Sequence, residues 1–317
     1  MLSRTADHLF WMARYIERAE NTSRILDVNL QTNMLPQANL GMSNSWQVML
    51  SICELESLYQ HHHTQISDDE VLHFMVVNAS NPSSIYNCFR AARENARAVR
   101  GSLPTEVWET VNTTWLDLQK LIDCALLQKD PSEFFEWVKF RSHLYRGVSI
   151  GTMLKDDAFR FTRIGTFLER ADNTARLLDV KFHDNTANTP AQNNRDLHTQ
   201  YYQWAAVLRS LSAFEMYRKV YRGVISAEKI AEIMILRSDM PRSLLGCLNG
   251  ICTNLEPLRC PNTERTEMMA NQLREEIEQL NLNDIFNQGL HAFLDNFLER
   301  INQIGSQMCR DVLVPID

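Results

Sequence analysis

Glycine and proline are scarce in this chain, which has only 10 glycines and 9 prolines among 317 residues. A β-rich fold needs such turn-forming residues at short intervals, so their scarcity argues against it and favours long helices. The seven cysteines are odd in number and form no C-x-x-C pair, so they indicate neither a redox motif nor a disulfide framework. Most of them fall in apolar helical patterns, where a free thiol behaves as a small hydrophobic group.

Long apolar runs are also missing, because charged residues interrupt each run before it reaches the length of a membrane span. The N-terminal residues lack the charge pattern of a signal peptide. The formal charge of −7 and the pI of about 5.8 argue against a nucleic acid as the main partner. We therefore expect a reduced, cytoplasmic protein that contacts neither a membrane nor a nucleic acid.

Motifs for a nucleotide, a metal centre or a catalytic serine are absent: there is no P-loop, no H-E-x-x-H, no paired E-x-x-H and no G-x-S-x-G. The run His61-His62-His63 invites a metal interpretation. However, consecutive helical residues point in different directions, and no Cys or carboxylate stands at ligand spacing around them. We expect no metal and no cofactor.

What the chain does contain is an internal repeat. Residues 17–28 read ERAENTSRILDV and residues 169–180 read ERADNTARLLDV, an offset of 152 that is close to half of 317. A repeat at this period predicts a protein built from two related halves. We place the halves at residues 1–154 and 155–317 and expect them to pack together as one body.

Apolar residues recur at helical spacing in both copies. Positions 9, 12, 16, 19, 23 and 26 are Leu, Met, Ile, Ala, Ser and Leu, and positions 161, 164, 168, 171, 175 and 178 are Phe, Ile, Leu, Ala, Ala and Leu. This 3-4 spacing predicts an amphipathic helix, and the small residues in its middle allow another helix to approach closely. We predict an all-α fold of about twelve helices in two duplicated halves, packed as one pseudo-twofold helical body.

The repeat continues beyond these helices at an offset of 159. Ser67 and Ser226 match as expected N-caps. Asn81-Pro82-Ser83-Ser84 matches Met240-Pro241-Arg242-Ser243, with each proline expected in the first turn of a helix. The copies also differ, because Thr166 stands at the position that corresponds to Arg14.

Several segments together resemble the bacterial alpha-E family, and they span nearly the whole chain. They are Leu2-Ser3-Arg4, Trp11, Arg14, Glu17-Arg18-Ala19-Glu20, Asn81-Pro82-Ser83-Ser84-Ile85, Ala92-Arg93-Glu94-Asn95-Ala96-Arg97, Glu169-Arg170-Ala171-Asp172 and residues 217–223, which read YRKVYRG. The resemblance implies an all-helical fold and an association with a circularly permuted ATP-grasp ligase-like protein. Transglutaminase-like peptidases, and sometimes a proteasome-related hydrolase, accompany the family. It also implies a role in making or modifying peptide or amide linkages.

The Glu-Arg helix is the first candidate site. The spacing of Arg14, Glu17, Asn21 and Arg24 places them on one face, with Glu20 at its edge. In a functional interpretation Glu17 or Glu20 acts as a general base or binds an amine, while Arg14 and Arg24 hold an anion. The ligand-binding candidates are Arg14, Arg18, Asn21, Arg24, Glu169, Arg170, Asn173 and Arg176. In a structural interpretation the same residues form an ion-pair network between helices, because two halves with one fold need the same interior contacts.

Four arginines at helical spacing form the second candidate: Arg90, Arg93, Arg97 and Arg100. The second half does not repeat most of them, so a shared folding requirement explains them less well. In an acidic protein such a stripe predicts a docking surface for an acidic partner or ligand. The alternative is a solvated face that is paired with neighbouring acidic residues.

Two functions and a structural alternative follow. The resemblance implies the first: an accessory helical component of an ATP-grasp-type peptide or amide ligation or peptide-modification system, which binds the ligase-like partner, a peptidase of the transglutaminase type, or an amino-acid- or peptide-like ligand. Alternatively, it is an enzyme of acyl or aminoacyl transfer or amide hydrolysis that uses Glu17 and Glu20. A third possibility is a purely structural scaffold, for which Glu17→Gln would reduce folding stability alone.

Overall fold

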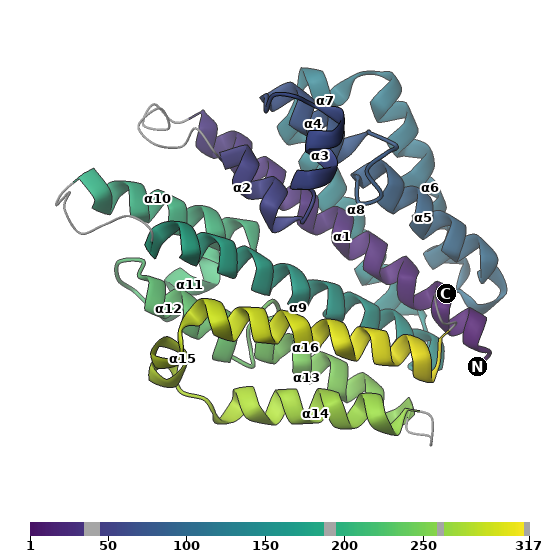
Figure 1. Ribbon diagram of the computed structural model, residues 1–317. Helices are drawn as coiled ribbons and strands as arrows, with labels where there is room; N and C mark the ends of the chain where they lie inside the picture. Colours follow the sequence, from purple (N-terminus) through teal and green to yellow (C-terminus); the bar gives the residue numbers. More distant parts are fainter. Residues whose placement is uncertain (35–44, 187–194, 259–262, 314–317) are drawn as a thin grey trace.

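The computed structural model describes residues 1–34, 45–186, 195–258 and 263–313 (Figure 1). Within these ranges every regular element is a helix and there is no β-strand, so the predicted all-α fold is confirmed. The first eight helices are α1 (Ser3–Asn33), α2 (Ser45–Ile52), α3 (Glu56–His62), α4 (Asp68–Val76), α5 (Ile85–Ala98), α6 (Thr105–Asp123), α7 (Leu126–Lys129) and α8 (Pro131–Thr152). The remaining eight are α9 (Asp157–Thr186), α10 (Arg195–Ser210), α11 (Phe214–Val220), α12 (Ala227–Ala231), α13 (Leu244–Leu255), α14 (Glu264–Gln279), α15 (Leu282–Gln288) and α16 (Leu290–Asp311).

The described residues thus form sixteen α-helices, more than the twelve or so that the sequence predicts. The excess consists of short helices such as α7, which has four residues, and α15, which has seven. A helix this short makes at most one or two turns and cannot display a 3.6-residue period, so pattern analysis assigns it to a loop.

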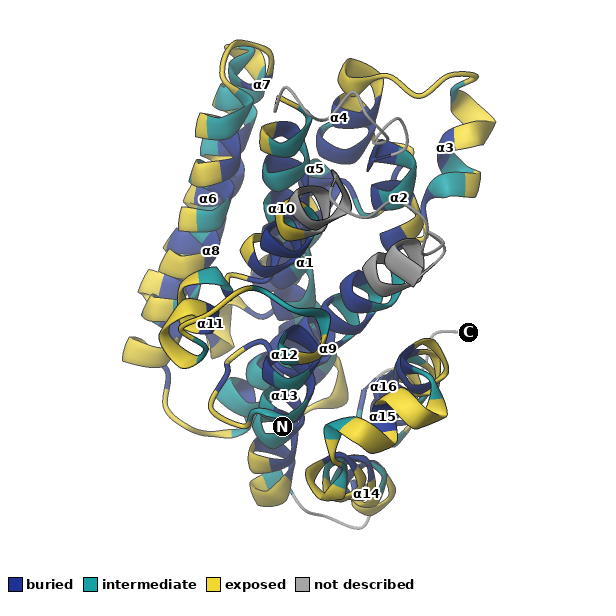
Figure 2. Cartoon of the chain, turned by 90° about the vertical axis from the view of Figure 1, so that its left-hand side faces the viewer, coloured by how far each residue is buried: buried dark blue, intermediate teal, exposed yellow. Residues whose placement is uncertain are grey.

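Helices α1 and α9 form the centre of the molecule. They run side by side in the same direction, with α3–α8 on one side of the pair and α11–α16 on the other (Figure 1). Helices α5 and α8 pack on α1, and α13 and α16 pack on α9. The view in Figure 2 shows α1 largely buried and the outer helix α15 largely exposed.

The two predicted apolar stripes are confirmed, since each of their twelve side chains is buried. Small residues do permit a close approach between α1 and α9, and one of them is Gly165, which lies outside the predicted stripes. A Cβ atom at Gly165 would lie well inside the van der Waals contact distance of the Phe10 carbonyl oxygen and 3.2 Å from the Phe10 carbonyl carbon. The two central helices are therefore in backbone contact near their N-termini.

Short polar caps begin several helices. Ser67 caps α4 by accepting from the backbone N–H of Glu70, and Ser226 caps α12 by accepting from that of Lys229, as predicted. The prolines before α5 and α13 are not in the first helical turn, contrary to prediction. Instead Ser84 and Ser243 are the N-caps, because their hydroxyls accept the first free backbone N–H groups.

None of the described helices is long and apolar enough to cross a membrane.

Candidate functional site

The Glu-Arg segments of α1 and α9 face each other in the buried centre of the molecule. Glu17 is 2% exposed, and its carboxylate accepts two hydrogen bonds from Arg170 of α9, at 2.8 and 3.0 Å. In the opposite direction Arg18 of α1 donates to Glu169 of α9 at 2.5 and 3.1 Å. Each Glu-Arg pair therefore binds the other through two-point contacts, the strongest geometry for an arginine and a carboxylate.

Glu20 lies one helical turn further along α1 and is fully buried. Its carboxylate accepts from Arg24 at 3.0 Å and from Arg146 at 2.5 Å. It also accepts from Arg242 at 2.6 Å and from the hydroxyl of Ser142 at 2.6 Å. Every lone pair that this carboxylate can present is thus engaged within the protein.

Arg14 marks the difference between the two halves of this network. It donates to Glu169 at 2.8 Å, whereas Thr166, at the corresponding place on α9, hydrogen bonds to the backbone of Thr162. The matching carboxylate, Glu17, instead receives Arg146 at 3.1 Å and Arg242 at 3.1 Å. The two sides therefore neutralise equivalent carboxylates with arginines from different elements.

The arginines keep all three glutamates ionised despite burial. Burial alone raises the pKa of Glu17, but Arg170 and Arg242 outweigh it and hold the pKa below its usual value. For Glu20, burial is again outweighed, chiefly by Arg242, and the pKa lies well below the usual value. For Glu169, Arg18 and Arg14 outweigh burial and lower the pKa to about 2. A carboxylate with a lowered pKa is a weak base, which is the reverse of what general-base catalysis needs.

These pKa values predict a loss of stability in acid. The ordinary value for a glutamate is 4.5, whereas the folded-state value for Glu169 is about 2. Between these two values the unfolded chain binds protons that the folded chain does not, so the free energy of unfolding falls as the pH falls. Urea denaturation at a series of pH values should show constant stability from these groups above about pH 5 and a decline from there toward pH 2.

The exposed carboxylate of Glu275 on α14, which pairs with Arg274 at 3.6 Å, serves as the comparison for this experiment. Because exposed ion pairs contribute little, Glu275→Gln should leave the acid dependence unchanged. A free energy of unfolding that stays flat down to pH 2 would show that the buried glutamates are not charged in the folded protein.

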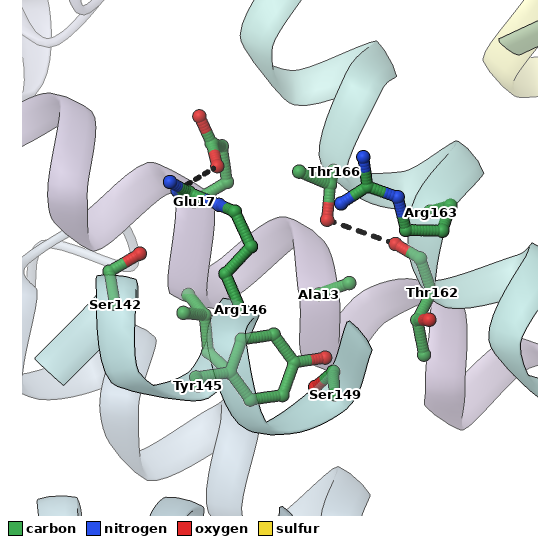
Figure 3. Close-up of a pocket in the computed structure, with 10 residues that line it drawn as sticks. Ala13, Glu17, Ser142, Tyr145, Arg146, Ser149, Thr162, Arg163 and Thr166 are labelled. Atoms are coloured by element: carbon green, nitrogen blue, oxygen red, sulfur yellow. Dashed lines mark hydrogen bonds and ion pairs between the residues drawn. The ribbon is translucent and has the colours of Figure 1, made fainter. Parts of the chain in front are cut away.

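A small cavity adjoins Glu17 on the side of α8 (Figure 3). Its volume is about 10 Å³, which is enough for one water molecule. Tyr145 and Ser149 turn hydroxyl groups without a hydrogen-bond partner toward this space, and burial raises the pKa of Tyr145 to about 12. The cavity therefore suits an ordered water and is too small to bring a substrate to Glu17.

A larger cavity, of about 200 Å³, lies on the other side of the α1–α9 seam. It brings together Arg18, Asn21, Glu169, Asn173 and Arg176, all of which the sequence predicts as ligand-binding residues. The other three predicted ligand-binding residues, Arg14, Arg24 and Arg170, contribute to the ion-pair network and do not line this cavity.

The arginine stripe runs along α5 and ends at Arg100 in the 3₁₀ turn that follows this helix, and it is only partly a free surface. Arg90, Arg97 and Arg100 are exposed; Arg97 pairs with Glu94 at 2.5 Å, and Arg100 covers the ring of Trp108 at 5.3 Å. Arg93 is half-buried and donates to Asn112 of α6 at 2.8 Å, so it connects two helices. The stripe therefore presents three cations to solvent, not four, and one of the three is paired with an acidic neighbour.

Arg146 and Arg242 are central to the network but are absent from the sequence prediction. Arg146 lies in the sequence YRGV of residues 145–148, which recurs at residues 221–224, outside the register of the repeat. Arg242 lies in the Pro-Arg-Ser segment that matches Pro82-Ser83-Ser84. The sequence did contain a signal for such residues. An arginine that occurs in only one copy of the repeat can pair with one of two otherwise equivalent carboxylates and so make them differ. Among the described residues, no cluster of His, Cys, Asp and Glu side chains could hold a metal ion.

Comparison with known proteins agrees with this geometry. The model of the Alpha-E family, a predicted alpha-helical domain with a conserved ER motif, matches residues 1–311. An uncharacterized protein of Mycobacterium bovis and uncharacterized proteins of two Mycobacterium tuberculosis strains are each 23% identical to the chain over 323 residues. The alignments cover 94% of this chain but only 35% of each relative, so the chain spans about a third of their length. No solved structure gives a significant match.

Proposed function

The chain belongs to the Alpha-E family, and from this membership and the geometry of the seam we propose that it is a non-catalytic, accessory component of an ATP-grasp-type peptide or amide ligation system. In this role it binds the ligase-like partner and an amino-acid- or peptide-like ligand. The peptide-modification reaction itself takes place on the partner.

The observation that carries the proposal is the complete pairing of the glutamates in the ER segments. Glu17, Glu20 and Glu169 are at most 5% exposed, and each accepts from at least two arginines. An enzyme that used Glu17 or Glu20 as a base would need a free carboxylate with a raised pKa beside an open cavity. The seam offers the opposite, a set of fixed charges that holds two helices together.

We further propose that residues 1–154 and 155–317 are duplicated halves. Within the described residues, eight α-helices (α1–α8) lie in the first half and eight (α9–α16) lie in the second. The longest helices occupy matching places, because α1 and α9 have 31 and 30 residues and α8 and α16 have 22 each. The reciprocal Glu17–Arg170 and Glu169–Arg18 contacts are what a pseudo-twofold relation between the halves requires.

Two exposed surfaces support a role as a binding component. The first is the α5 surface of Arg90, Arg97 and Arg100. The second is the outer face of α8, where Phe140 is 65% and Leu144 is 36% exposed. Gly147 and Gly151 continue that face with open space above them. Exposed apolar faces of this kind mark interaction sites.

Length supports the same role. The mycobacterial relatives contain a region similar to this chain together with nearly twice as much additional sequence. A region of this kind that recurs within a longer protein is suited to work beside other domains.

Reversing the charges on α5 is expected to weaken association with the ligase-like partner. The variant carries Arg90→Glu, Arg97→Glu and Arg100→Glu, and it retains Arg93 because that residue connects α5 to α6. Placing like charges opposite an acidic partner raises Kd by at least tenfold, or about 1.4 kcal/mol. Biolayer interferometry with a circularly permuted ATP-grasp ligase-like protein from the same genome measures this change.

The control for this variant applies the same change in charge elsewhere, at the exposed residues Lys120, Lys129 and Lys155. Unchanged affinity of the arginine variant would contradict docking on α5, and loss of binding by Phe140→Ser would then place the interface on α8. If the wild-type chain forms no complex with such a ligase, the proposed function is wrong.

A further inference from the structure

The cavity of about 200 Å³ beside the α1–α9 seam differs in size and lining from the cavity of about 10 Å³ beside Glu17. It lies between α1, the end of α2, the loop before α5, and α9. The loop before α13 occupies the corresponding place on the opposite side, where Arg242 reaches inward to donate to Asn21 at 2.8 Å and to Glu20 at 2.6 Å.

The cavity exists because of one difference between these two loops. Pro82-Ser83-Ser84 before α5 matches Pro241-Arg242-Ser243 before α13, and each final serine caps its helix. Ser83 therefore stands where the other loop has Arg242. Its hydroxyl accepts from Arg18 at 3.5 Å and has no reach toward Asn173. The space that a guanidinium fills on one side is thus open on the other.

Asn21 and Asn173 both line this space. Asn21 is 3% exposed and Asn173 is partly buried, and the Nδ2 atom of each is buried without a hydrogen-bond partner. The orientation of Asn21 is set by its neighbour, because its Oδ1 must accept from Arg242 and its Nδ2 must then point away. A buried donor without a partner is costly, so both amides call for acceptor oxygens in the cavity.

The charges around the cavity define the rest of the ligand. Its lining includes two cations, Arg18 and Arg176, and three carboxylates, Glu54, Glu169 and Asp172, for a formal balance of −1. Both arginines are already paired, Arg18 with Glu169 and Arg176 with Asp172 and Glu54. The cavity therefore has no free cation for a phosphate or another multiply charged anion. The carboxylate of Glu54 pairs with Arg176 through one oxygen, but it is 70% exposed and its other oxygen can accept from a positive group at the rim.

We propose that this cavity binds a zwitterionic amino acid or dipeptide. The carboxylate or carbonyl oxygens of the ligand accept from Asn21 and Asn173, and its ammonium group lies near Glu54 and Asp172. The volume of about 200 Å³ is roughly twenty times that of the cavity beside Glu17, which holds one water molecule, and it can admit a ligand of this size. The inference rests on the proposed function in that it names the ligand of a binding component, but it does not depend on the identity of the protein partner.

Calorimetric titration of the full chain with glycylglycine tests this site. Asn21→Asp and Asn173→Asp preserve the shape of each side chain, but they replace its amide donor with a charged oxygen. At position 21 the variant also keeps the oxygen that accepts from Arg242. Each is expected to raise the Kd for glycylglycine at least tenfold. Asn287→Asp, on the exposed face of α15, adds the same charge away from the cavity and should leave the Kd unchanged.

Three further probes separate the elements of the proposal. N-acetylglycine lacks the ammonium group, and glycinamide lacks the carboxylate. Inorganic phosphate has neither an ammonium group nor a carboxylate. All three should bind at least tenfold more weakly than glycylglycine. Tighter binding of phosphate, or equal binding of glycylglycine by the wild type and by Asn21→Asp and Asn173→Asp chains whose thermal unfolding is normal, would overturn the proposal. So would the absence of glycylglycine binding at millimolar concentration, whether or not the ligase-like partner binds.

Discussion

Exchanging Glu20 for glutamine is expected to lower the free energy of unfolding by about 3–5 kcal/mol, because removing one partner of a buried ion pair leaves the others uncompensated. Glu20 is fully buried and is the common acceptor of Arg24, Arg146 and Arg242. Glutamine preserves the size of the side chain, so the loss reports charge and not packing. Urea denaturation followed by circular dichroism measures it.

The comparison for Glu20→Gln is Glu136→Gln on α8. Glu136 also pairs with a cation, Lys139, but its side chain is 72% exposed. Exposed pairs contribute about 0–1 kcal/mol, so this variant should unfold almost as the wild type does. Equal stability of the two variants would mean that the carboxylate of Glu20 is not held by the three arginines, and the enzyme alternative would then regain its main requirement.

Replacing Gly165 with alanine is expected to destabilise the protein by about 1–3 kcal/mol, the usual cost of overpacking a buried contact. Helix propensity alone would predict a gain in stability, because it favours alanine over glycine by about 1 kcal/mol. A loss of stability would therefore report the close contact between the helices. The new Cβ would overlap the carbonyl group of Phe10, a backbone group that cannot move away as a flexible side chain can. The helices α1 and α9 would have to separate.

Gly147 provides the matched control for this substitution. It lies inside α8, and a Cβ atom there would meet nothing within 4 Å. Gly147→Ala should therefore leave stability unchanged or raise it by up to about 1 kcal/mol. If Gly165→Ala is also stabilising, then α1 and α9 do not approach as closely as the structure indicates.

A separation of α1 and α9 would also affect the proposed ligand cavity. Asn21 and Asn173 lie on these two helices, and the distance between their amide groups depends on how the helices cross. Gly165→Ala should therefore weaken glycylglycine binding together with stability, whereas Asn173→Asp should weaken binding alone. This contrast distinguishes the framework of the site from its contacts with the ligand.

Much of the fold could be predicted because its signals are local. The apolar stripes along α1 and α9 appear as a 3-4 spacing within a few turns, and the N-caps Ser67 and Ser226 depend on the next three residues alone. The short helices were missed for the same reason, since a helix of four to seven residues contains too little sequence to show a period.

The sequence predicted several residues of the candidate site but not the contacts that they make. The repeat indicated that Glu17, Arg18, Glu169 and Arg170 belong to the interior, and the structure places all four at the α1–α9 contact. Their partners were not predictable in this way. Arg242 reaches Glu20 across 222 residues of sequence, a separation at which no periodicity relates two positions.

The sequence by itself thus determined that the chain is helical and that its two Glu-Arg segments are equivalent, because period and repeat are properties of neighbouring residues. Only the tertiary structure decided that the glutamates are buried and paired with arginines, that Arg242 satisfies one side of the seam, and that Ser83 stands in its place on the other side. Those outcomes depend on the crossing of α1 and α9 and on which loop lies within a few ångströms of each carboxylate. Hydrogen bonds and ion pairs form or fail at that scale, and distances between remote segments are set by packing, not by spacing in the chain.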